Sequence, residues 1–285
     1  MHICTDIAEL RRNVQAWKKV GERVALVPTM GNLHRGHLRL VQAAKQHAQR
    51  VVVSVFVNPL QFNEAADFKA YPRTLDDDAQ QLRAVATDLL FAPDVDVIYP
   101  RGQAGNTKVL VPGISDVLEG EHRPGHFTGV ATVVAKLFNM VQPDVALFGE
   151  KDFQQLLLIR RMAADLDLPI EIISVATERE ADGLAMSSRN SRLSAEQRQL
   201  APVIYQTLRT LQRQLVQGDH RYTILEQQAM AALNQAGFRA EYVAVRRAAD
   251  LQPATPDDTT QVVLLAAWLG QIRLIDNLML ALNPR

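Results

Sequence analysis

The chain has 285 residues, and its 31 basic and 31 acidic side chains give a formal net charge of zero. Hydrophobic residues make up 47% of the chain and charged residues 22%, a composition typical of a globular protein with a buried core. This balance gives no indication of a broad basic face for nucleic acid, although it leaves open a local basic pocket for a phosphorylated ligand.

The cysteine content and the first residues bear on the cellular compartment. Cys4 is the only cysteine, so no intrachain disulfide forms, as is usual in reducing compartments. Residues 1–6 lack the basic-then-apolar pattern of a signal peptide, and the longest apolar stretches, such as residues 51–57, are too short to span a membrane. We expect a cytoplasmic protein with neither a nucleic-acid nor a membrane partner.

Over the first two-thirds of the chain, short apolar runs alternate with amphipathic segments. The first predicted strand ends at Pro28, which cannot donate to a sheet ladder. The predicted strands cover residues 24–27, 51–57, 88–92, 145–148 and 170–175, and the predicted helices cover residues 36–49, 75–86, 127–141 and 153–166. Strands alternating with helices of this length indicate βαβ units, so we predict a doubly wound, Rossmann-like parallel sheet with helices on both faces.

The pattern changes after about residue 179. Ser194 and Gln197 form a capping box that opens a helical stretch to about residue 216, which Pro202 kinks or divides. A helix at residues 222–236 and strands at 241–245, 262–268 and 272–278 follow. We predict a larger domain at residues 1–178 and a smaller C-terminal α+β domain with antiparallel strands at residues 179–285.

The strongest chemical signal lies between the first predicted strand and helix, in the sequence Pro-Thr-Met-Gly-Asn-Leu-His-Arg-Gly-His of residues 28–37. Open parallel sheets bind ligands at the carboxyl ends of their strands, and a helix N-terminus offers N–H groups to phosphate. His34 and His37 are three residues apart and so point the same way, where they can stabilise phosphate charge. Gly31 and Gly36 let a ligand approach the backbone. Two surface histidines on a capped helix are the alternative, and two imidazoles are too few for zinc.

Three other loops carry polar side chains. In residues 148–155, Lys151 offers charge to a phosphate, and the amides of Gln154 and Gln155 can orient a hydroxyl or carboxylate. Residues 186–190 read Met-Ser-Ser-Arg-Asn, which indicates either a phosphate-binding loop or a polar linker. Gln61 follows the second predicted strand and either reads a small polar substrate or lies in an ordinary turn. Neither a G-x-G-x-x-G fingerprint, a P-loop nor a G-x-S-x-G elbow is present.

The His-x-Gly-His signature with a later Ser-Ser-Arg loop resembles the nucleotidylyltransferase superfamily. Over nearly its full length the chain resembles the pantoate–β-alanine ligase (pantothenate synthetase) family. The motifs that carry this resemblance are residues 28–31 with His34 and His37, residues 58–59 with 61–62, residues 71–74 and 123–127, Gly129 with Val130, residues 148–155 and 186–190, and residues 269–270 with 273–277.

The resemblance implies an ATP-dependent ligase. Such enzymes adenylate the carboxylate of (R)-pantoate with release of pyrophosphate, and the amine of β-alanine then displaces AMP to give pantothenate. Magnesium accompanies the ATP, and the family is typically a homodimer. The C-terminal domain would act as a lid that bears the Ser-Ser-Arg loop and excludes water from the labile adenylate.

By position, the resemblance also implies the site residues. His34 and His37 would contact the ATP phosphates, as electrostatic stabilisers first and with His37 as proton donor second. The residues implied in catalysis are His34, His37, Lys151, Ser187, Ser188 and Arg189. Those implied in binding ATP are Met30, Gly31, Asn32, Leu33, His34, Arg35, Gly36, His37, Gly149, Glu150, Lys151, Asp152, Glu178, Met186, Ser187, Ser188 and Arg189. Gln61 and Gln155 would hold pantoate, with Asn58 and Arg123 as further substrate-binding candidates.

Two positions depart from the family pattern. Arg35 stands where an acidic residue is common, and we expect its side chain to face solvent. Glu178 stands where an apolar residue is common, near the adenine, so a contact through its backbone would preserve function. Asp77 and Asp78 are candidate magnesium ligands, although an exposed acidic helix face is the interpretation we favour. A plain nucleotidylyltransferase and a non-catalytic nucleotide sensor remain the competing hypotheses.

Overall fold

The computed structural model describes residues 1–62 and 65–282, which divide into two compact units. The first unit comprises Met1–Gly149 and Gln154–Ala176, and the second comprises Glu150–Phe153 and the chain from Thr177 onward. In the described part of the chain, no helix is both long and apolar enough to cross a membrane.

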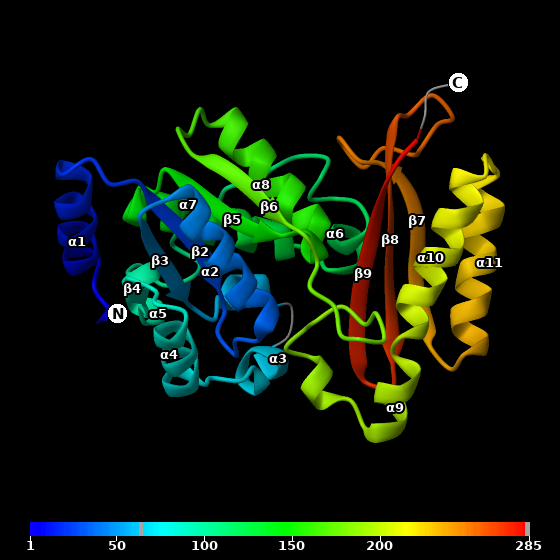
Figure 1. Ribbon diagram of the computed structural model, residues 1–285, viewed down its shortest axis with the longest axis horizontal. Helices are drawn as coiled ribbons and strands as arrows, with labels where there is room; N and C mark the ends of the chain where they lie inside the picture. The colour runs from blue at the N-terminus through cyan, green and yellow to red at the C-terminus, as the bar shows by residue number, and fades with distance from the viewer. Residues whose placement is uncertain (63–64, 283–285) are drawn as a thin grey trace. The chain divides into compact units, whose positions relative to one another are not determined.

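The first unit is built on a six-stranded parallel sheet in the order β1-β4-β3-β2-β5-β6 (Figure 1). Its strands are β1 (His2–Cys4), β2 (Val24–Thr29), β3 (Arg50–Val55), β4 (Leu89–Phe91), β5 (Val145–Gly149) and β6 (Glu171–Val175). The longer helices are α1 (Ile7–Lys19), α2 (Arg35–His47), α4 (Leu75–Ala84), α7 (His126–Val141) and α8 (Phe153–Asp165). The shorter ones are η1 (Pro59–Gln61), α3 (Ala65–Ala70), α5 (Val95–Ile98) and α6 (Glu119–His122).

Successive side chains along each strand point to opposite faces of the sheet, and a layer of helices packs on each face. Val27 and Val53 face one way and pack with Leu40 of α2 and Leu82 of α4. On the other face α7 packs against the sheet, and its Phe138 meets the ring of Phe148 edge-on at 6.5 Å. The helix α1 contacts α7 and β2. The structure therefore confirms the predicted doubly wound parallel sheet with helices on both faces.

The prediction that the first strand ends at Pro28 is wrong, because β2 continues to Thr29 in register with β3. The carbonyl of Thr29 accepts the N–H of Phe56, so the polar groups of Pro28 point to the opposite side, toward β5. Pairing with β5 extends only to Leu26. The missing N–H of Pro28 therefore costs no ladder bond.

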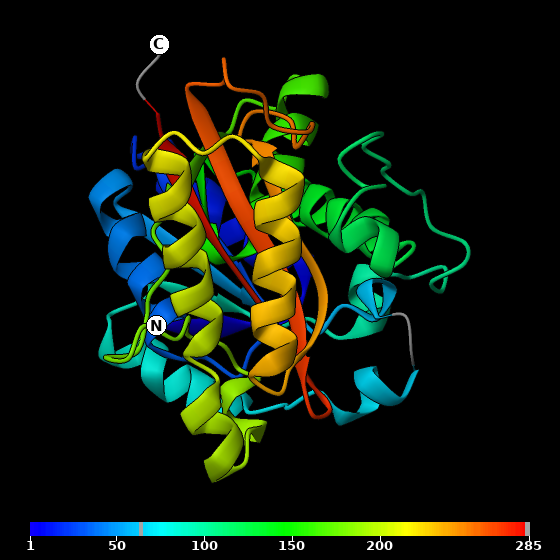
Figure 2. The ribbon, with the colours of Figure 1, turned by 90° about the vertical axis from the view of Figure 1, so that its right-hand side faces the viewer.

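The second unit is an antiparallel sheet in the order β7-β8-β9 with helices over one face (Figure 2). This confirms the predicted α+β character of the C-terminal part. Its strands are β7 (Arg239–Arg247), β8 (Thr260–Leu269) and β9 (Ile272–Ala281). Its helices are η2 (Glu150–Asp152), η3 (Asn190–Arg192), α9 (Ala195–Leu200), α10 (Val203–Val216) and α11 (Tyr222–Gln235).

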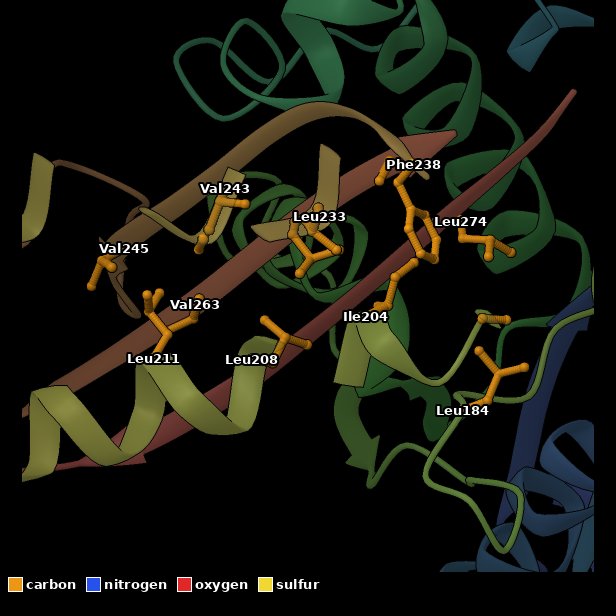
Figure 3. Packing of buried hydrophobic residues seen from close by; sticks show 14 of the residues in the cluster. Leu184, Ile204, Leu208, Leu211, Leu233, Phe238, Val243, Val245, Val263 and Leu274 are labelled. Atoms are coloured by element: carbon orange, nitrogen blue, oxygen red, sulfur yellow. The ribbon is translucent and has the colours of Figure 1, made fainter. Parts of the chain in front are cut away.

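The core of the second unit lies between these helices and the sheet. Leu208 and Leu211 of α10, Leu233 of α11 and Val263 of β8 belong to this core, and all four are buried (Figure 3). Ser194 and Gln197 form the predicted capping box at the start of α9. As predicted, the helical stretch is divided at Pro202, which precedes the first residue of α10.

Candidate active site

The predicted site residues fall into two groups, one on each unit. The first unit carries Met30, Gly31, Asn32, Leu33, His34, Arg35, Gly36, His37, Asn58, Gln61, Arg123, Gly149 and Gln155. The second carries Glu150, Lys151, Asp152, Glu178, Met186, Ser187, Ser188 and Arg189.

His34 and His37 cap the start of α2 reciprocally. The Nδ1 of His34 accepts the N–H of Gly36 at 3.1 Å, and the Nδ1 of His37 accepts the N–H of His34 at 3.2 Å. Their ring centroids lie 4.1 Å apart. Ordinary capping boxes use Ser or Thr with Glu or Gln, so imidazoles here do the same work while keeping a second nitrogen on each ring.

These caps fix the chemistry of the two rings. A nitrogen that accepts a backbone N–H carries no proton, so the proton of each neutral ring resides on Nε2. His34 and His37 therefore present Nε2–H as their donor groups, which suits hydrogen bonding to phosphate oxygens. Between them, Arg35 is exposed, as expected for its side chain.

The backbone before these histidines is held by Asp78. Its Oδ2 accepts the N–H of Asn32 at 3.0 Å, and its Oδ1 accepts the N–H of Leu33 at 2.7 Å. Asp78 is only 1% exposed, so the favoured interpretation of an exposed acidic helix face is wrong for this residue. It is right for Asp77, which is exposed. The sequence did not predict these two contacts of Asp78, because periodicity shows which face of the helix carries the residue but not which loop packs against that face.

Gly31 in this loop is required by conformation. Its φ is +80°, and a Cβ placed there would lie 2.9 Å from Oδ2 of Asp78 and 3.0 Å from Cγ1 of Val55. Asn32 follows with a φ of +49°, a region that Asn tolerates better than most residues. Gly31 thus lets the loop close onto Asp78, a reason separate from the predicted approach of a ligand.

Gln61 ends η1, and Asn58 holds its side chain. Nδ2 of Asn58 donates to Oε1 of Gln61 at 3.1 Å, and Nε2 of Gln61 lies 2.9 Å from the sulfur of Met30. Oδ1 of Asn58 accepts the hydroxyl of Tyr99 at 2.7 Å. Burial raises the pKa of Tyr99, which keeps this hydroxyl protonated as a donor. Asn58 is 1% exposed, and its amide holds the side chain of Gln61 in place. A direct contact between Asn58 and substrate stays a prediction.

The backbone of Gln61 is held from the other side by the start of α7. Its carbonyl accepts Nη2 of Arg123 at 3.2 Å and lies 2.9 Å from Nδ1 of His126. A Cβ on Gly129 would lie 2.3 Å from the carbonyl oxygen of Leu60, so only glycine lets α7 approach η1 this closely. Arg123 therefore supports Gln61, and its predicted role in binding substrate stays untested.

The two adjacent glutamines of α8 differ in environment. Gln154 is 3% exposed, donates to the carbonyls of Ile114 and Val117, and accepts the N–H of Glu119. Its amide therefore bonds to backbone groups and is not positioned to bind substrate. Gln155 is half-buried, and Gly149 ends β5 at the carboxyl edge of the sheet, as the sequence predicted.

In the second unit, Lys151 lies in the single turn η2 and is half-buried, while Asp152 is exposed. Its Nζ lies 3.8 Å from Oδ1 of Asp152. The side chain of Asn277 on β9 donates to the carbonyls of both Glu150 and Lys151 at 2.8 Å. Sequence reasoning missed Asn277, although adjacent Asp and Asn in a mostly apolar strand were a usable signal.

The Ser-Ser-Arg loop is anchored through Glu178. The carbonyl of Glu178 accepts the N–H of Met186 at 2.9 Å, so this contact does not depend on the side chain that departs from the family pattern. The Oγ of Ser187 accepts the N–H of Arg189 at 3.2 Å. The loop thus begins from a fixed backbone pair, and Met186, Ser187, Ser188 and Arg189 are all half-buried.

Next to Glu178, Arg179 forms a buried pair with Asp276. Nη1 and Nη2 of Arg179 donate to the two carboxylate oxygens at 2.6 and 2.9 Å, and the guanidinium lies 4.1 Å over the ring of Tyr205. Burial raises the pKa of Asp276, and the hydrogen bonds from Arg179 oppose that shift. The pair is an internal anchor of the second unit.

Comparison with known proteins places this arrangement in context. Residues 2–279 match the family model described as pantoate-beta-alanine ligase. The chain is 56% identical to a pantothenate synthetase of Thioalkalivibrio sulfidiphilus over 277 residues, which covers 97% of each chain. It is 52% identical to one of Aliivibrio fischeri over 282 residues, or 99% of this chain and 97% of that relative.

Solved structures agree. A pantothenate synthetase from Thermus thermophilus superposes with a TM-score of 0.90 at 46% identity, covering 98% of this chain and 99% of that one. A pantoate-beta-alanine ligase from Francisella tularensis, complexed with beta-gamma ATP and beta-alanine, gives a TM-score of 0.81 at 34% identity over 98% and 97% of the two chains.

Proposed function

Because the chain belongs to the pantoate–β-alanine ligase family, we propose that it joins (R)-pantoate to β-alanine with ATP, giving pantothenate, AMP and pyrophosphate. The structural observation that carries this proposal is the pair of reciprocally capped imidazoles at the start of α2, which present two Nε2–H donors. The Francisella tularensis relative, with its ATP and β-alanine ligands, supports the choice of substrates.

The reaction needs two displacements. A carboxylate oxygen of pantoate attacks the α-phosphorus of ATP, and the bond to the bridging oxygen breaks so that pyrophosphate leaves. The amine of β-alanine then attacks the carbonyl carbon of the mixed anhydride. AMP leaves with the former carboxylate oxygen, and the amine loses a proton to give the amide. The first step turns a poor electrophile into a reactive one, so the protein has to position reactants and neutralise phosphoryl charge.

The two groups of residues supply different parts of this work. His34 and His37 donate through Nε2–H to the phosphate oxygens and oppose charge that develops there. Lys151, Ser187, Ser188 and Arg189 add cationic and hydroxyl donors to the same phosphates. Gln61 and Gln155 hold pantoate, with Asn58 and Arg123 fixing the position of Gln61. The assignment of these roles and of the wider ATP-binding set is part of the proposal.

Magnesium fits this site as a companion of ATP. Within residues 1–62 and 65–282, no group of three or more His, Cys, Asp or Glu is arranged to hold a metal ion. Both oxygens of Asp78 accept backbone N–H groups, which leaves Asp77 as the better of the two candidate carboxylates. Mg²⁺ commonly binds through substrate phosphates, water and one or two carboxylates, and supplies charge neutralisation when bound.

We further propose that the protein acts as a homodimer in the cytoplasm, with residues 179–285 serving as the lid over the reaction. Family resemblance supports the dimer, and a single buried Cys4 fits a reducing compartment. Light scattering on the purified protein tests the dimer directly, and a mass of one chain, 31.7 kDa, would contradict it.

The test of the activity is a defined incubation. Purified protein with ATP, Mg²⁺, pantoate and β-alanine should yield pantothenate and AMP in equal amounts by mass spectrometry. Leaving out pantoate should abolish AMP formation, which separates this reaction from a plain nucleotidylyltransferase or a nucleotide sensor. Absence of pantothenate from the complete mixture would refute the assignment.

A further inference from the structure

The turn that carries Lys151 is held by a side chain far away in the sequence. Nδ2 of Asn277 lies 2.8 Å from the carbonyl oxygen of Glu150 and 2.8 Å from that of Lys151. Asn277 is 5% exposed, so water cannot easily take over these bonds. We propose that Asn277 is a positioning residue for Lys151, an inference that rests on the phosphate-stabilising role proposed above for this lysine.

The location of the two bonds explains why they matter. The carbonyls of Glu150 and Lys151 belong to the two peptide groups that flank the Cα of Lys151. Each peptide group is planar, so holding both of them fixes φ and ψ at Lys151 and thereby the direction of its Cα–Cβ bond. A lysine carries a compact charge on a flexible four-carbon stem, so fixing the base of that stem narrows where the ammonium group can go.

Asn277 is itself held through its backbone. In β9 it lies opposite Leu264 of β8. Its main-chain N–H donates to Oδ1 of Asp276 at 2.8 Å, and its carbonyl accepts Nη2 of Arg179 at 3.3 Å. Because Arg179 also donates to both carboxylate oxygens of Asp276, the unpaired edge of β9 is held in place at Asn277. The amide is therefore aimed from rigid backbone.

The sequence of β9 carries a second indication. Leu274 and Leu280 are buried in the apolar core of the second unit, as a strand packed on helices requires. Asp276 and Asn277 are adjacent, polar and buried, at 3% and 5% exposure. Burying two consecutive polar side chains costs stability unless they make specific bonds, and here those bonds end at Arg179 and at the Lys151 turn.

A double-mutant cycle tests the inference. We expect Asn277→Ala to lower the single-turnover rate of adenylate formation by roughly tenfold to a hundredfold, with the KM for pantoate changed by less than about twofold. In a Lys151→Ala background the same substitution should cost less than about twofold more, because the lysine it positions is gone. Asn277→Ser, which is too short to reach both carbonyls, should show the same pattern and replaces Asn277→Ala should that variant fold poorly.

Two other outcomes would overturn the inference. Equal losses from Asn277→Ala with and without Lys151 would make Asn277 a merely structural residue and overturn the inference, while the proposed function stands. A Lys151→Ala variant that forms adenylate at the normal rate would refute the proposed role of Lys151 and the inference with it. Leu280→Val, on the same strand, is the matched control: it should lower the Tm yet leave the saturated rate unchanged in both backgrounds.

Discussion

His37 caps the backbone of His34 through Nδ1 and, in the proposed role, donates to phosphate through Nε2. Nδ1 accepts the N–H of His34, and the proton therefore resides on Nε2. These two functions sit at different positions on the ring, so they can be separated by substitution. The amide oxygen of Asn reaches about as far as Nδ1, whereas the amide of Gln reaches about as far as Nε2.

We expect His37→Asn to retain the cap and the Tm while lowering the rate of pantoyl-adenylate formation by roughly 10²–10³-fold, the usual cost of one lost transition-state donor. His37→Gln should recover part of that rate through its amide N–H. Pre-steady-state measurement of adenylate formation gives the rate for each variant, and a thermal melt gives its Tm. A normal rate in His37→Asn would show that Nε2 has no part in the first step.

Asp78 supports the loop before His34 through both of its carboxylate oxygens. In Asp78→Asn one amide N–H must face a backbone N–H of Asn32 or Leu33, and that buried donor is left without an acceptor. We expect the free energy of unfolding to fall by about 1–3 kcal/mol, with a higher KM for ATP. Urea unfolding and initial rates measure both effects. Asp76→Asn, at an exposed position of the same helix, is the control and should change stability by less than about 0.5 kcal/mol; equal effects would contradict a specific role for Asp78.

Close contacts between helices fix the position of the side chains in the candidate site. The approach of α7 to η1 depends on Gly129, where a Cβ would lie 2.3 Å from the carbonyl oxygen of Leu60 and 2.8 Å from the N of Gln61. This contact adds to the bonds from Arg123 and His126 that hold the carbonyl of Gln61. The position of the predicted pantoate-binding amide is therefore set by how closely two elements pack.

We expect Gly129→Ala to push η1 away from α7 and to lower kcat/KM for pantoate by roughly tenfold to a hundredfold, with the KM for ATP little changed. Steady-state kinetics with each substrate varied in turn measure the difference. Thr128→Ala, one residue earlier on the same helix, is the matched control. An equal rise in both KM values for Gly129→Ala would indicate general damage to the fold in place of a displaced Gln61.

Local patterns were enough for most elements, because periodicity and caps are read from neighbouring residues. Short continuous apolar runs predicted β3 and β5, and the capping box at Ser194 predicted the start of α9. The helix α1 was missed although Asp6 caps it and Leu10 and Val14 have helical spacing. The contacts of Asp78 and of Asn277 span 45 and 127 residues of sequence, so no local pattern contains them.

The chain as a whole combines a first unit that carries His34, His37 and Gln61 with a second unit that carries Lys151 and the Ser-Ser-Arg loop. In the proposed reaction all of these groups serve one event, the transfer of the adenylyl group of ATP to the carboxylate of pantoate. An alternative route through an acyl phosphate would instead release ADP and phosphate. The fate of the carboxylate oxygens distinguishes the two routes, because only adenylation places one of them on AMP.

The decisive measurement is the reaction of pantoate labelled with ¹⁸O in its carboxylate, together with ATP, Mg²⁺ and β-alanine. Adenylation predicts one labelled oxygen in each AMP formed and none in pyrophosphate, as read by mass spectrometry. Unlabelled AMP, or labelled phosphate formed together with ADP, would contradict it.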